Sequence, residues 1–549
     1  MEYYLLKKIQ NYLQVNNLDA MIIPSIDPHM SEYVAESFQF RKVVSGFTGS
    51  AGTLVVGKKE SALWTDSRYY LQAEIELQDS GILLMRDGEE QTPSVAEWIF
   101  SQKTETKELL VGYDFSFISV DWEKKFVTEI THLGGICNRF NVDYDEFWID
   151  RPLMPSGEIW IYEENFAGES VGQKIERLRK LMIEKSKRTD SYTIVSKLDE
   201  IAWLLNLRGS DVAYTPVFYA YLLVSQKQVV LYVDEQKLSP KVKAYLEENN
   251  IEIKQYFKNC VLQEIEKEDL YLCYDSKVLS VAIFSLIKKV GYEGLSLVGE
   301  MKAIKNETEI KNLRLAMKKD AKAIMAFEKW LFEALQNKED LTEISVAEKL
   351  LFFRQQQDGF LSESFAPIVA YAEHGAIVHY SATPKTNKKI ESRGFLLIDS
   401  GGHYLEGTTD ITRTYCLGDL TEEMSQNYEA VRKGNEALSK IVFPKGTCGF
   451  HLDVLARQFL WQLGLNYGHG TGHGIGQCLC VHEGPQNISQ RVIEVPLQAG
   501  MIVSNEPGYY KSGEYGIRIE NQLLVKTSSV SEDFLCFEVL TQVPIQKLG

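Results

Sequence analysis

Five ionisable side chains, each close to glycine-rich sequence, constrain this 549-residue chain more than any other feature. In chain order they are Asp399, Asp410, His473, Glu506 and Glu520. Asp399 ends an apolar stretch and Asp410 begins another, and the glycines between them predict a strand-turn-strand that sets the two carboxylates side by side. Glu506 and Glu520 flank a second glycine-containing turn in the same way. The chain must therefore fold so that several carboxylates meet at one place.

The histidines indicate the same half of the chain. Seven of the nine lie between residues 374 and 482, and His473 belongs to the run Tyr467–Gly476, which reads YGHGTGHGIG. Such clustering of histidines is not expected in a purely structural protein. The run alone could be a mobile loop, but the five side chains in this order predict a functional site.

Four carboxylates at one place would repel one another, and two divalent cations would cancel their charge. Mostly oxygen ligands with one imidazole nitrogen suit Mn²⁺, Zn²⁺ or Co²⁺ better than copper or an iron–sulfur cluster. Two such ions can share a hydroxide, lower its pKa and stabilise both sides of a hydrolysis. The set therefore predicts a metal-dependent hydrolase with two divalent metal ions. The ligands do not decide between Mn²⁺, Zn²⁺ and Co²⁺, and of these we expect Mn²⁺ first.

Composition limits the partners and the compartment. The net charge of −17 disfavours binding to nucleic acid, whose phosphates require a basic surface. The first residues lack the apolar core of a signal peptide, and no apolar run approaches the length of a membrane-spanning helix. The eight cysteines are scattered, which suits a reducing cytosol. We therefore expect a cytoplasmic protein without a nucleic-acid or membrane partner.

The chain divides into three segments at changes in its pattern. A stretch with two prolines and a glycine ends the first segment, which we predict as residues 1–157. The second is predicted as 158–300, and the third, which carries the five side chains, as 301–549. Helical spacing of apolar residues predicts that the third segment opens with two helices, Lys302–Ala316 and Ala321–Leu335.

The first two segments contain similar pairs of strands. The pair Gly52–Val56 and Ala62–Asp66 is similar to the pair Ala220–Val224 and Gln228–Asp234. A duplicated α/β domain and a chance likeness both explain this similarity, and the strand pairs alone do not separate them.

At these residues the chain resembles the pita-bread metallopeptidases, and among them the three-domain cytosolic Xaa-Pro aminopeptidases (aminopeptidase P). Further stretches carry the resemblance, namely Ser45–Thr53, Trp64–Tyr70, Leu198–Asp211 and Ala376–Tyr380. The resemblance covers essentially the whole chain and implies an α/β (α+β) fold, with two creatinase-N-like α/β domains followed by a C-terminal pita-bread catalytic domain. It also implies a homodimer. The chain stops short of the C-terminal tail that such relatives commonly carry, so that tail is expected to be absent.

The resemblance implies a metal role for each of the five side chains. Asp399 would bind one metal ion, and His473 and Glu506 would hold the other. Asp410 and Glu520 would bridge the two ions. Glu506 would also act as the catalytic general base for the bridging hydroxide.

Five further residues would bind the substrate if the resemblance holds. His379 and His482 would be catalytic, because they would orient the scissile carbonyl and stabilise the tetrahedral intermediate. His469, Tyr510 and Arg518 would line the pocket for the proline. Each of the three histidines could instead be a satisfied structural residue.

The implied reaction is hydrolysis of the N-terminal Xaa-Pro bond, which releases the first residue from peptides with a free N-terminus and proline second. An Xaa-Pro bond has no N–H and a restricted φ, so general peptidases handle it poorly. One alternative is a prolidase, restricted to dipeptides, although prolidases usually have one front domain. Another is a catalytically inactive pita-bread binding module, although such proteins have typically lost metal ligands.

Overall fold

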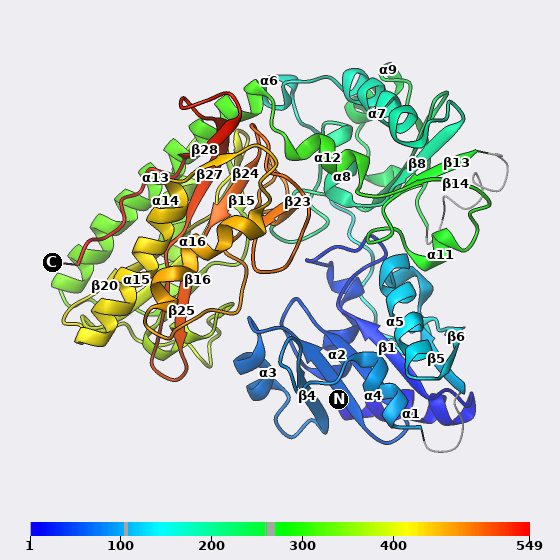
Figure 1. Ribbon diagram of the computed structural model, residues 1–549, viewed down its shortest axis with the longest axis horizontal. Coiled ribbons are helices and arrows are strands. Elements are labelled where there is room, and N and C mark those ends of the chain that lie inside the picture. Colours follow the sequence, from blue (N-terminus) through cyan, green and yellow to red (C-terminus); the bar gives the residue numbers. More distant parts are fainter. Residues whose placement is uncertain (1, 104–107, 258–259, 261–269, 549) are drawn as a thin grey trace. The chain divides into compact units, whose positions relative to one another are not determined.

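The computed structural model describes residues 2–103, 108–257, 260 and 270–548, which form two compact units (Figure 1). Unit 1 comprises Met1–Ile161, Ser170–Ala213 and Val217–Val298. Unit 2 comprises Tyr162–Glu169, Tyr214–Pro216 and Gly299–Gly549, so it contains all five side chains of the predicted metal site.

Unit 1 contains two six-stranded sheets with helices between their strands. The strands of the first sheet are β1 (Ala20–Pro24), β2 (Thr53–Gly57), β3 (Ser61–Thr65), β4 (Ile82–Arg86), β5 (Glu108–Tyr113) and β6 (Ile136–Asn141). Those of the second are β8 (Ser191–Val195), β10 (Ala220–Ser225), β11 (Val229–Val233), β12 (Glu252–Gln255), β13 (Tyr271–Tyr274) and β14 (Val290–Glu293). The longer helices are α1 (Glu2–Val15), α5 (Val120–His132), α7 (Val171–Ser186) and α9 (Pro240–Glu248).

The two sheets have the same topology. The first has the order β4-β3-β2-β1-β5-β6 and the second the order β12-β11-β10-β8-β13-β14. The antiparallel strands are β3, β2 and β1 in the first sheet and β11, β10 and β8 in the second. All other neighbouring strands in the two sheets are parallel. The similar strand pairs in the sequence are β2 with β3 and β10 with β11, which hold equivalent places. The predicted duplication of an α/β domain is therefore confirmed.

Unit 2 combines several small sheets with four long helices. The helices are α13 (Glu307–Gln336), α14 (Glu343–Gln355), α15 (Glu422–Ser439) and α16 (Gly449–Trp461). A three-stranded sheet has β17 (Phe395–Ser400) between β16 (Ile368–Tyr371) and β20 (Ile411–Cys416). A six-stranded sheet contains β21 (Val442–Pro444), β28 (Phe534–Val539), β27 (Asn521–Thr527), β24 (Ile502–Asn505), β22 (Gly472–Gly474) and β23 (Glu483–Ile488), in that order. A hairpin joins β25 (Gly508–Lys511) to β26 (Tyr515–Arg518).

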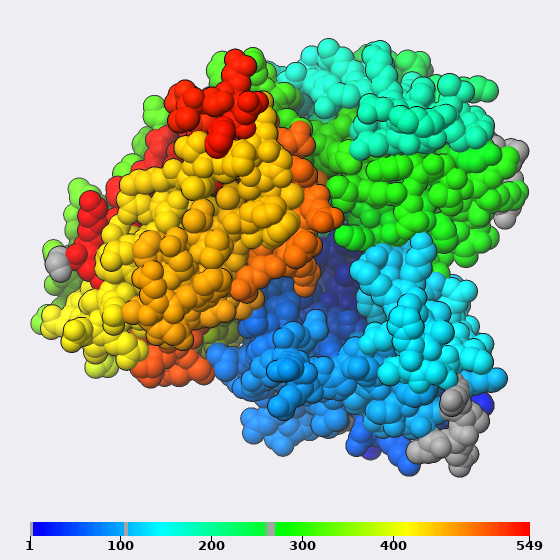
Figure 2. Space-filling view, viewed as in Figure 1, coloured from blue at the N-terminus to red at the C-terminus, as the bar shows by residue number. Residues whose placement is uncertain are grey.

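Helices cover both faces of the six-stranded sheet. Alternate residues of a strand point to opposite faces, and apolar residues of β24 and β27 pack against helices on each face. Ile502 of β24 and its partner Leu524 of β27 pack with Leu313 of α13. The next pair, Val503 and Leu523, packs on the other face with residues of α15 and α16. In Figure 1, α13 runs alongside α14, and in the space-filling view α15 and α16 form much of the visible face of unit 2 (Figure 2). The strand ends that carry the predicted ligands thus lie between two layers of helix.

The prediction of two separate helices at the start of the third segment was wrong. A single helix, α13, runs from Glu307 to Gln336. Asn306 caps it through a reciprocal pair of hydrogen bonds with Glu309. Residues 317–320, which separate the two predicted helices, contain neither proline nor glycine. Asp320 in this stretch is buried in an ion pair with Arg354 of α14. The charged residues in this stretch therefore do not end the helix.

Within the part of the chain that the structure describes, the helices are all too short or too polar to cross a membrane.

Candidate active site

Two antiparallel strand pairs bring the predicted ligands together. In the β17–β20 pair, Asp399 lies opposite Thr412, and Asp410 directly precedes β20. Both aspartates therefore come to the same end of this pair, as the glycine-rich turn predicted. This end of the pair is one half of the site.

The other half repeats the arrangement. Asn505 of β24 pairs with Asn521 of β27, so Glu506 and Glu520 flank neighbouring strand ends. The hairpin formed by β25 and β26 connects these two glutamates. His473 lies on β22, which pairs with β24 through Gly474. The predicted convergence of the carboxylates and the imidazole is present in the structure.

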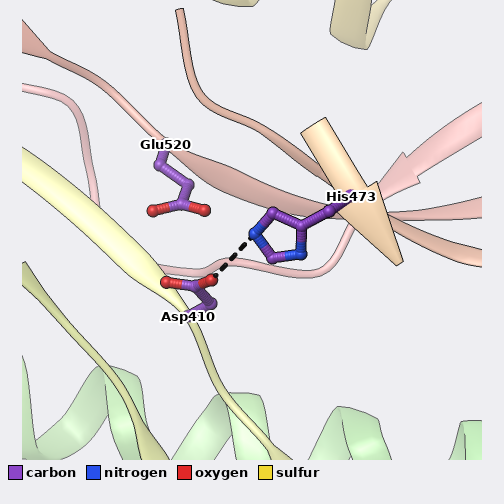
Figure 3. Close-up of side chains that lie close together, drawn as sticks. All are labelled: Asp410, His473 and Glu520. Carbon is purple, nitrogen blue, oxygen red and sulfur yellow. Dashed lines mark ion pairs between the residues drawn. The ribbon is translucent and has the colours of Figure 1, made fainter. Parts of the chain in front are cut away.

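Asp410, His473 and Glu520 form the centre of this group (Figure 3). One ligand atom from each lies within 4.8 Å of the others. His473 Nε2 is 3.5 Å from Asp410 Oδ2 and 3.4 Å from Glu506 Oε1. Asp399 lies on the neighbouring strand and is held by Arg518, whose Nη2 is 2.7 Å from its Oδ2. The set offers oxygen and nitrogen ligands of the kind that divalent metals bind.

Burial and mutual repulsion perturb the carboxylates. Burial, with repulsion from Asp410, raises the pKa of Asp399 above its usual range, against the opposing effect of Arg518. Burial raises the pKa of Glu506 to about 7, and burial with repulsion from the neighbouring carboxylates raises the pKa of Glu520 well above its usual range. Burial alone would lower the pKa of His473, but Asp410 and Glu506 raise it to about 9. The group therefore holds more negative charge than the protein compensates.

Two buried oxygen atoms support the same conclusion. Asp399 Oδ1 and Glu520 Oε1 have no hydrogen-bond partner among the described residues. A buried carboxylate oxygen without a donor is costly, and a cation would satisfy it. The ligand set, its charge and these two oxygens fit divalent metal ions.

Comparison with known proteins identifies the family. The model of the metallopeptidase family M24 matches residues 311–527, and models of the creatinase/prolidase N-terminal domain match residues 6–135 and 150–309. Aminopeptidase P2 of Arabidopsis thaliana is 42% identical over 96% of this chain and 79% of its own length. The chain belongs to the Xaa-Pro aminopeptidases of metallopeptidase family M24. Xaa-Pro aminopeptidase 1 of Dictyostelium discoideum is 39% identical over 98% of this chain and 88% of its own length.

Solved structures support the same assignment for this M24 metallopeptidase. The X-prolyl aminopeptidase of Caenorhabditis elegans, a cytosolic enzyme with a di-nuclear active site, aligns with a TM-score of 0.91 and 34% identity. The alignment covers 96% of this chain and 87% of that one. The Xaa-Pro dipeptidase of Bacillus anthracis is 26% identical with a TM-score of 0.55, over 69% of this chain and 99% of that one. The predicted fold, with two creatinase-type domains before a pita-bread domain, is confirmed.

In this M24 metallopeptidase, the residues predicted to line the proline pocket form a chain of contacts that ends at Asp399. His469 Nε2 lies 2.8 Å from the hydroxyl oxygen of Tyr510. Arg518 Nη1 donates to that same oxygen at 2.6 Å, and Arg518 Nε donates to Asp399 Oδ2 at 3.1 Å. Burial raises the pKa of Tyr510 to about 12, so its hydroxyl remains protonated. The three predicted pocket residues are therefore linked to a predicted ligand.

Of the two predicted catalytic histidines, His482 contacts a predicted ligand and His379 adjoins a residue that Arg518 contacts. The ring of His482 packs edge-on against His473, with 4.3 Å between centroids. His379 follows Val378, whose carbonyl oxygen accepts from Arg518 Nη2 at 3.3 Å. His482 thus contacts a predicted metal ligand, and His379 is linked to Asp399 through the backbone of Val378 and the guanidinium of Arg518.

Sequence reasoning missed the residues that orient the ligands. Thr412 donates to Glu520 Oε2 at 2.8 Å, and Ser504 donates to Glu506 Oε1 at 3.1 Å. Ser504 also accepts from the backbone N–H of His473 at 3.0 Å. Ser504 is two residues before Glu506, within an apolar strand. Because side chains two apart in a strand share a face, this spacing could have identified it.

Proposed function

We propose that the chain is a metal-dependent aminopeptidase that hydrolyses the bond between the first residue and a proline in second position. Products are the free first residue and a peptide that begins with proline. Membership of the Xaa-Pro aminopeptidases of family M24 supports this reaction class. The observation that carries the proposal is the cluster of Asp410, His473 and Glu520, with ligand atoms within 4.8 Å of one another and charge left uncompensated.

We propose that Asp399, Asp410, His473, Glu506 and Glu520 hold two divalent ions. When bound, these ions supply an acidified water and polarise the scissile carbonyl. Mn²⁺ remains the first expectation and Zn²⁺ or Co²⁺ the alternatives. The arrangement of His473 favours this role, because its Nδ1 lies 2.8 Å from the carbonyl oxygen of Gly474. The Nδ1–H tautomer leaves the Nε2 lone pair directed at the carboxylates.

Glu506 has the properties of a proton carrier. Its Oε1 lies 3.4 Å from His473 Nε2, among the other predicted ligands, and we propose that this carboxylate accepts a proton from the attacking water. As in any amide hydrolysis, the proline nitrogen must receive a proton to leave as an amine. We infer that Glu506 passes the proton on to that nitrogen as the C–N bond breaks.

The remaining predicted residues would bind the substrate. Arg518 fixes Oδ2 of Asp399 and leaves Oδ1 available to a cation. Tyr510 and His469 continue from Arg518, and we propose that these three residues line the proline pocket. His379 and His482 would donate to the carbonyl oxygen as negative charge develops on it.

The test is hydrolysis of the tripeptide Arg-Pro-Pro by metal-stripped protein, before and after Mn²⁺ is added. The proposal expects release of free arginine that requires the metal. Glu506→Gln should abolish the release, whereas Glu328→Gln should retain it. Glu328 is a matched control, because it is a partly buried carboxylate in the same unit that accepts from the hydroxyl of Tyr415 at 2.9 Å, away from the predicted ligands.

Other outcomes would favour the alternatives. Cleavage of Xaa-Pro dipeptides but not of Arg-Pro-Pro would indicate a prolidase. The B. anthracis dipeptidase aligns with only 69% of this chain, whereas the C. elegans aminopeptidase aligns with 96%, which favours the aminopeptidase. Absence of both metal binding and hydrolysis would indicate a binding module.

We also infer a division into residues 1–157, 158–300 and 301–549, a cytoplasmic location and a homodimer. The three family-model ranges support the division, since each lies within or close to one segment. The cytosolic C. elegans enzyme supports the location. Sedimentation equilibrium would test the dimer, which predicts twice the mass of one chain.

A further inference from the structure

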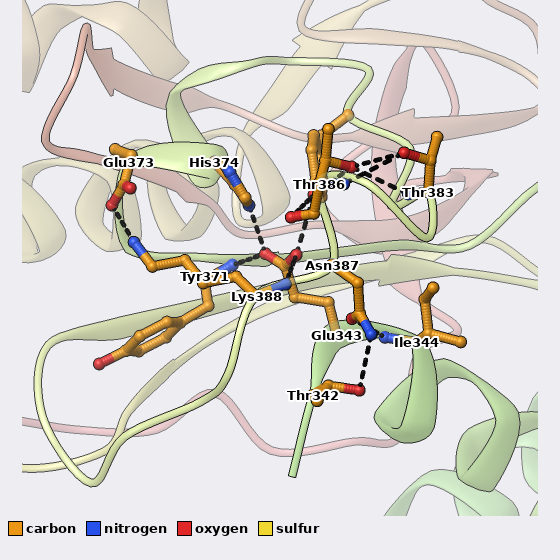
Figure 4. Close-up of polar contacts among 11 residues, drawn as sticks. Thr342, Glu343, Ile344, Tyr371, Glu373, His374, Thr383, Thr386, Asn387 and Lys388 are labelled. Carbon is orange, nitrogen blue, oxygen red and sulfur yellow. Dashed lines mark hydrogen bonds and ion pairs between the residues drawn. The ribbon is translucent and has the colours of Figure 1, made fainter.

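Another buried carboxylate in unit 2, that of Glu343 at the start of α14, accepts four hydrogen bonds (Figure 4). Its Oε1 accepts from the backbone N–H of Tyr371 at 2.9 Å and lies 2.8 Å from His374 Nδ1. Its Oε2 accepts from the hydroxyl of Tyr380 at 2.8 Å and from the backbone N–H of Lys388 at 3.0 Å. Each carboxylate oxygen therefore has two partners.

Two of these partners close a short loop. His374 and Tyr380 contact the same carboxylate, and their rings stack with 4.5 Å between centroids and 25° between planes. Residues 375–379 lie between them, so Glu343 holds both ends of this loop. The loop carries His379, one of the two histidines that the proposed function places at the scissile carbonyl.

The loop also contacts the strand that carries Arg518. A Cβ atom on Gly375 would lie 2.8 Å from the backbone nitrogen of Gly516 in β26, so the two backbones touch without room for a side chain. Arg518 Nη2 donates to the carbonyl oxygen of Val378 at 3.3 Å and to Asp399 Oδ2 at 2.7 Å. The position of the loop is thus coupled to the guanidinium that orients a predicted metal ligand.

We propose that Glu343 is a positioning residue for the hydrolysis: it fixes the loop 375–379 and, through the loop, the imidazole of His379. This inference rests on the proposed function, which assigns His379 to the scissile carbonyl. Glu343 itself acts only through other groups. A misplacement of about 1 Å in a group that contacts the reacting atoms costs on the order of 100-fold in rate.

The loss should appear in kcat rather than in KM, because a group that stabilises developing charge acts in the transition state. Glu343→Gln keeps the shape of the side chain but replaces one acceptor oxygen with an NH₂ group, which then faces two donors. With Arg-Pro-Pro as substrate, we expect kcat to fall about 10- to 100-fold, while KM stays within about threefold.

A milder variant keeps the test valid if Glu343→Gln does not fold. Tyr380→Phe removes one donor to Glu343 and retains the stack on His374. We expect kcat to fall about 3- to 10-fold with KM unchanged.

A double-mutant cycle with His379→Ala separates positioning from general destabilisation. If Glu343 acts through His379, Glu343→Gln costs no more than about twofold in kcat once His379 has been removed. A purely structural defect would instead lower kcat by the same factor in both backgrounds. The same comparison applies to Tyr380→Phe.

Asp320→Asn is the matched control. Asp320 lies on α13 and is buried. Its Oδ1 accepts from Nε of Arg354 at 2.8 Å, and Arg354 lies on α14, the helix that begins with Glu343. The hydrogen-bond partners of Asp320 among the described residues lie outside the loop 375–379. We expect Asp320→Asn to lower the melting temperature and to leave kcat unchanged.

Three results would overturn the inference. They are wild-type kcat in both Glu343→Gln and Tyr380→Phe, equal losses with and without His379, and a loss in Asp320→Asn as large as that in Glu343→Gln. An inactive wild-type protein would overturn the proposed function as well, and the wild-type assay distinguishes that case from the other three.

Discussion

Two of the buried carboxylate sites in unit 2, Glu343 and the group around Asp410, differ in how their charge is satisfied. Glu343 is fully buried, and hydrogen-bond donors occupy both of its oxygens. In the group around Asp410, by contrast, Asp399 Oδ1 and Glu520 Oε1 have no hydrogen-bond partner among the described residues. A buried charge is tolerated where hydrogen bonds surround it and is costly where they are missing.

The difference teaches that burial alone does not identify a metal site. A carboxylate whose donors come from one loop holds that loop in place. Several carboxylates that repel one another, with oxygens left over, require cations.

The largest effect is expected from Glu506→Gln. Loss of the general base should lower kcat for Arg-Pro-Pro by about 10³-fold or more. In the metal-free protein the same change should raise the free energy of unfolding at pH 8 by about 1–3 kcal/mol, because it removes a charge that burial disfavours. Urea unfolding of chelator-treated protein measures the second effect. A fall in stability would place Glu506 in the same class as Glu343.

The free energy of unfolding of the metal-free protein should depend on pH, because burial of Glu506 disfavours its charged form. The pKa of Glu506 is about 7 in the folded chain, above the ordinary value of 4.5. Between these two pH values the folded state holds a proton that the unfolded state has lost, so the free energy of unfolding falls as pH rises. His473, with a pKa raised from 6.5 to about 9, continues the fall over that higher window.

The comparison with Glu506→Gln isolates the contribution of Glu506. Across pH 4.5 to 7 we expect wild-type protein to lose about 2–3 kcal/mol relative to this variant when both are metal-free. Chemical denaturation at a series of pH values supplies the curves. Parallel curves would contradict the account.

Glu343→Gln should have the opposite effect on stability. It leaves donors without an acceptor, so the free energy of unfolding should fall by about 2 kcal/mol whether or not metal is present. Glu339→Gln, an exposed change just before α14, is the control and should shift stability by less than about 0.5 kcal/mol. A rise in stability for Glu343→Gln would remove the contrast between the two groups.

The smallest effect is expected from Thr412→Val, which keeps the side-chain shape and deletes the hydroxyl that donates to Glu520. Loss of a partner that orients a metal ligand should weaken Mn²⁺ binding by about tenfold. Thr414→Val is a demanding comparison, because Thr414 also lies on β20 and, among the described residues, its hydroxyl bonds to the backbone of Arg518 in β26 and not to a predicted ligand side chain. Titration calorimetry should show that the first variant binds Mn²⁺ more weakly than the second.

The arrangement of the five predicted ligands could be anticipated from the sequence because it depends on local rules. Asp399 and Asp410 flank one turn, and Glu506 and Glu520 flank another, so strand pairing alone brings each pair together. The similar strand pairs of unit 1 also follow from local pattern, but they left a duplicated domain and a chance likeness open until the sheet topology was known.

Other features depend on contacts between distant residues and could not be predicted. Glu343 reads in the sequence as an ordinary acidic residue at a helix start, yet its partners lie between Tyr371 and Lys388. The continuity of α13 likewise depends on Asp320, whose charge is satisfied by Arg354 of the next helix. A local pattern carries no record of such partners.

The most direct test of the central claim is a count of bound Mn²⁺ by titration calorimetry of metal-stripped protein near pH 7, with the wild-type chain and the two variants Glu506→Gln and Glu343→Gln. The account predicts two ions per chain for the wild type, with release of protons because His473 and Glu506 must lose theirs to bind metal. It predicts two ions for Glu343→Gln and weakened or incomplete binding for Glu506→Gln. No binding by the wild type, or equal binding by wild type and Glu506→Gln, would contradict it.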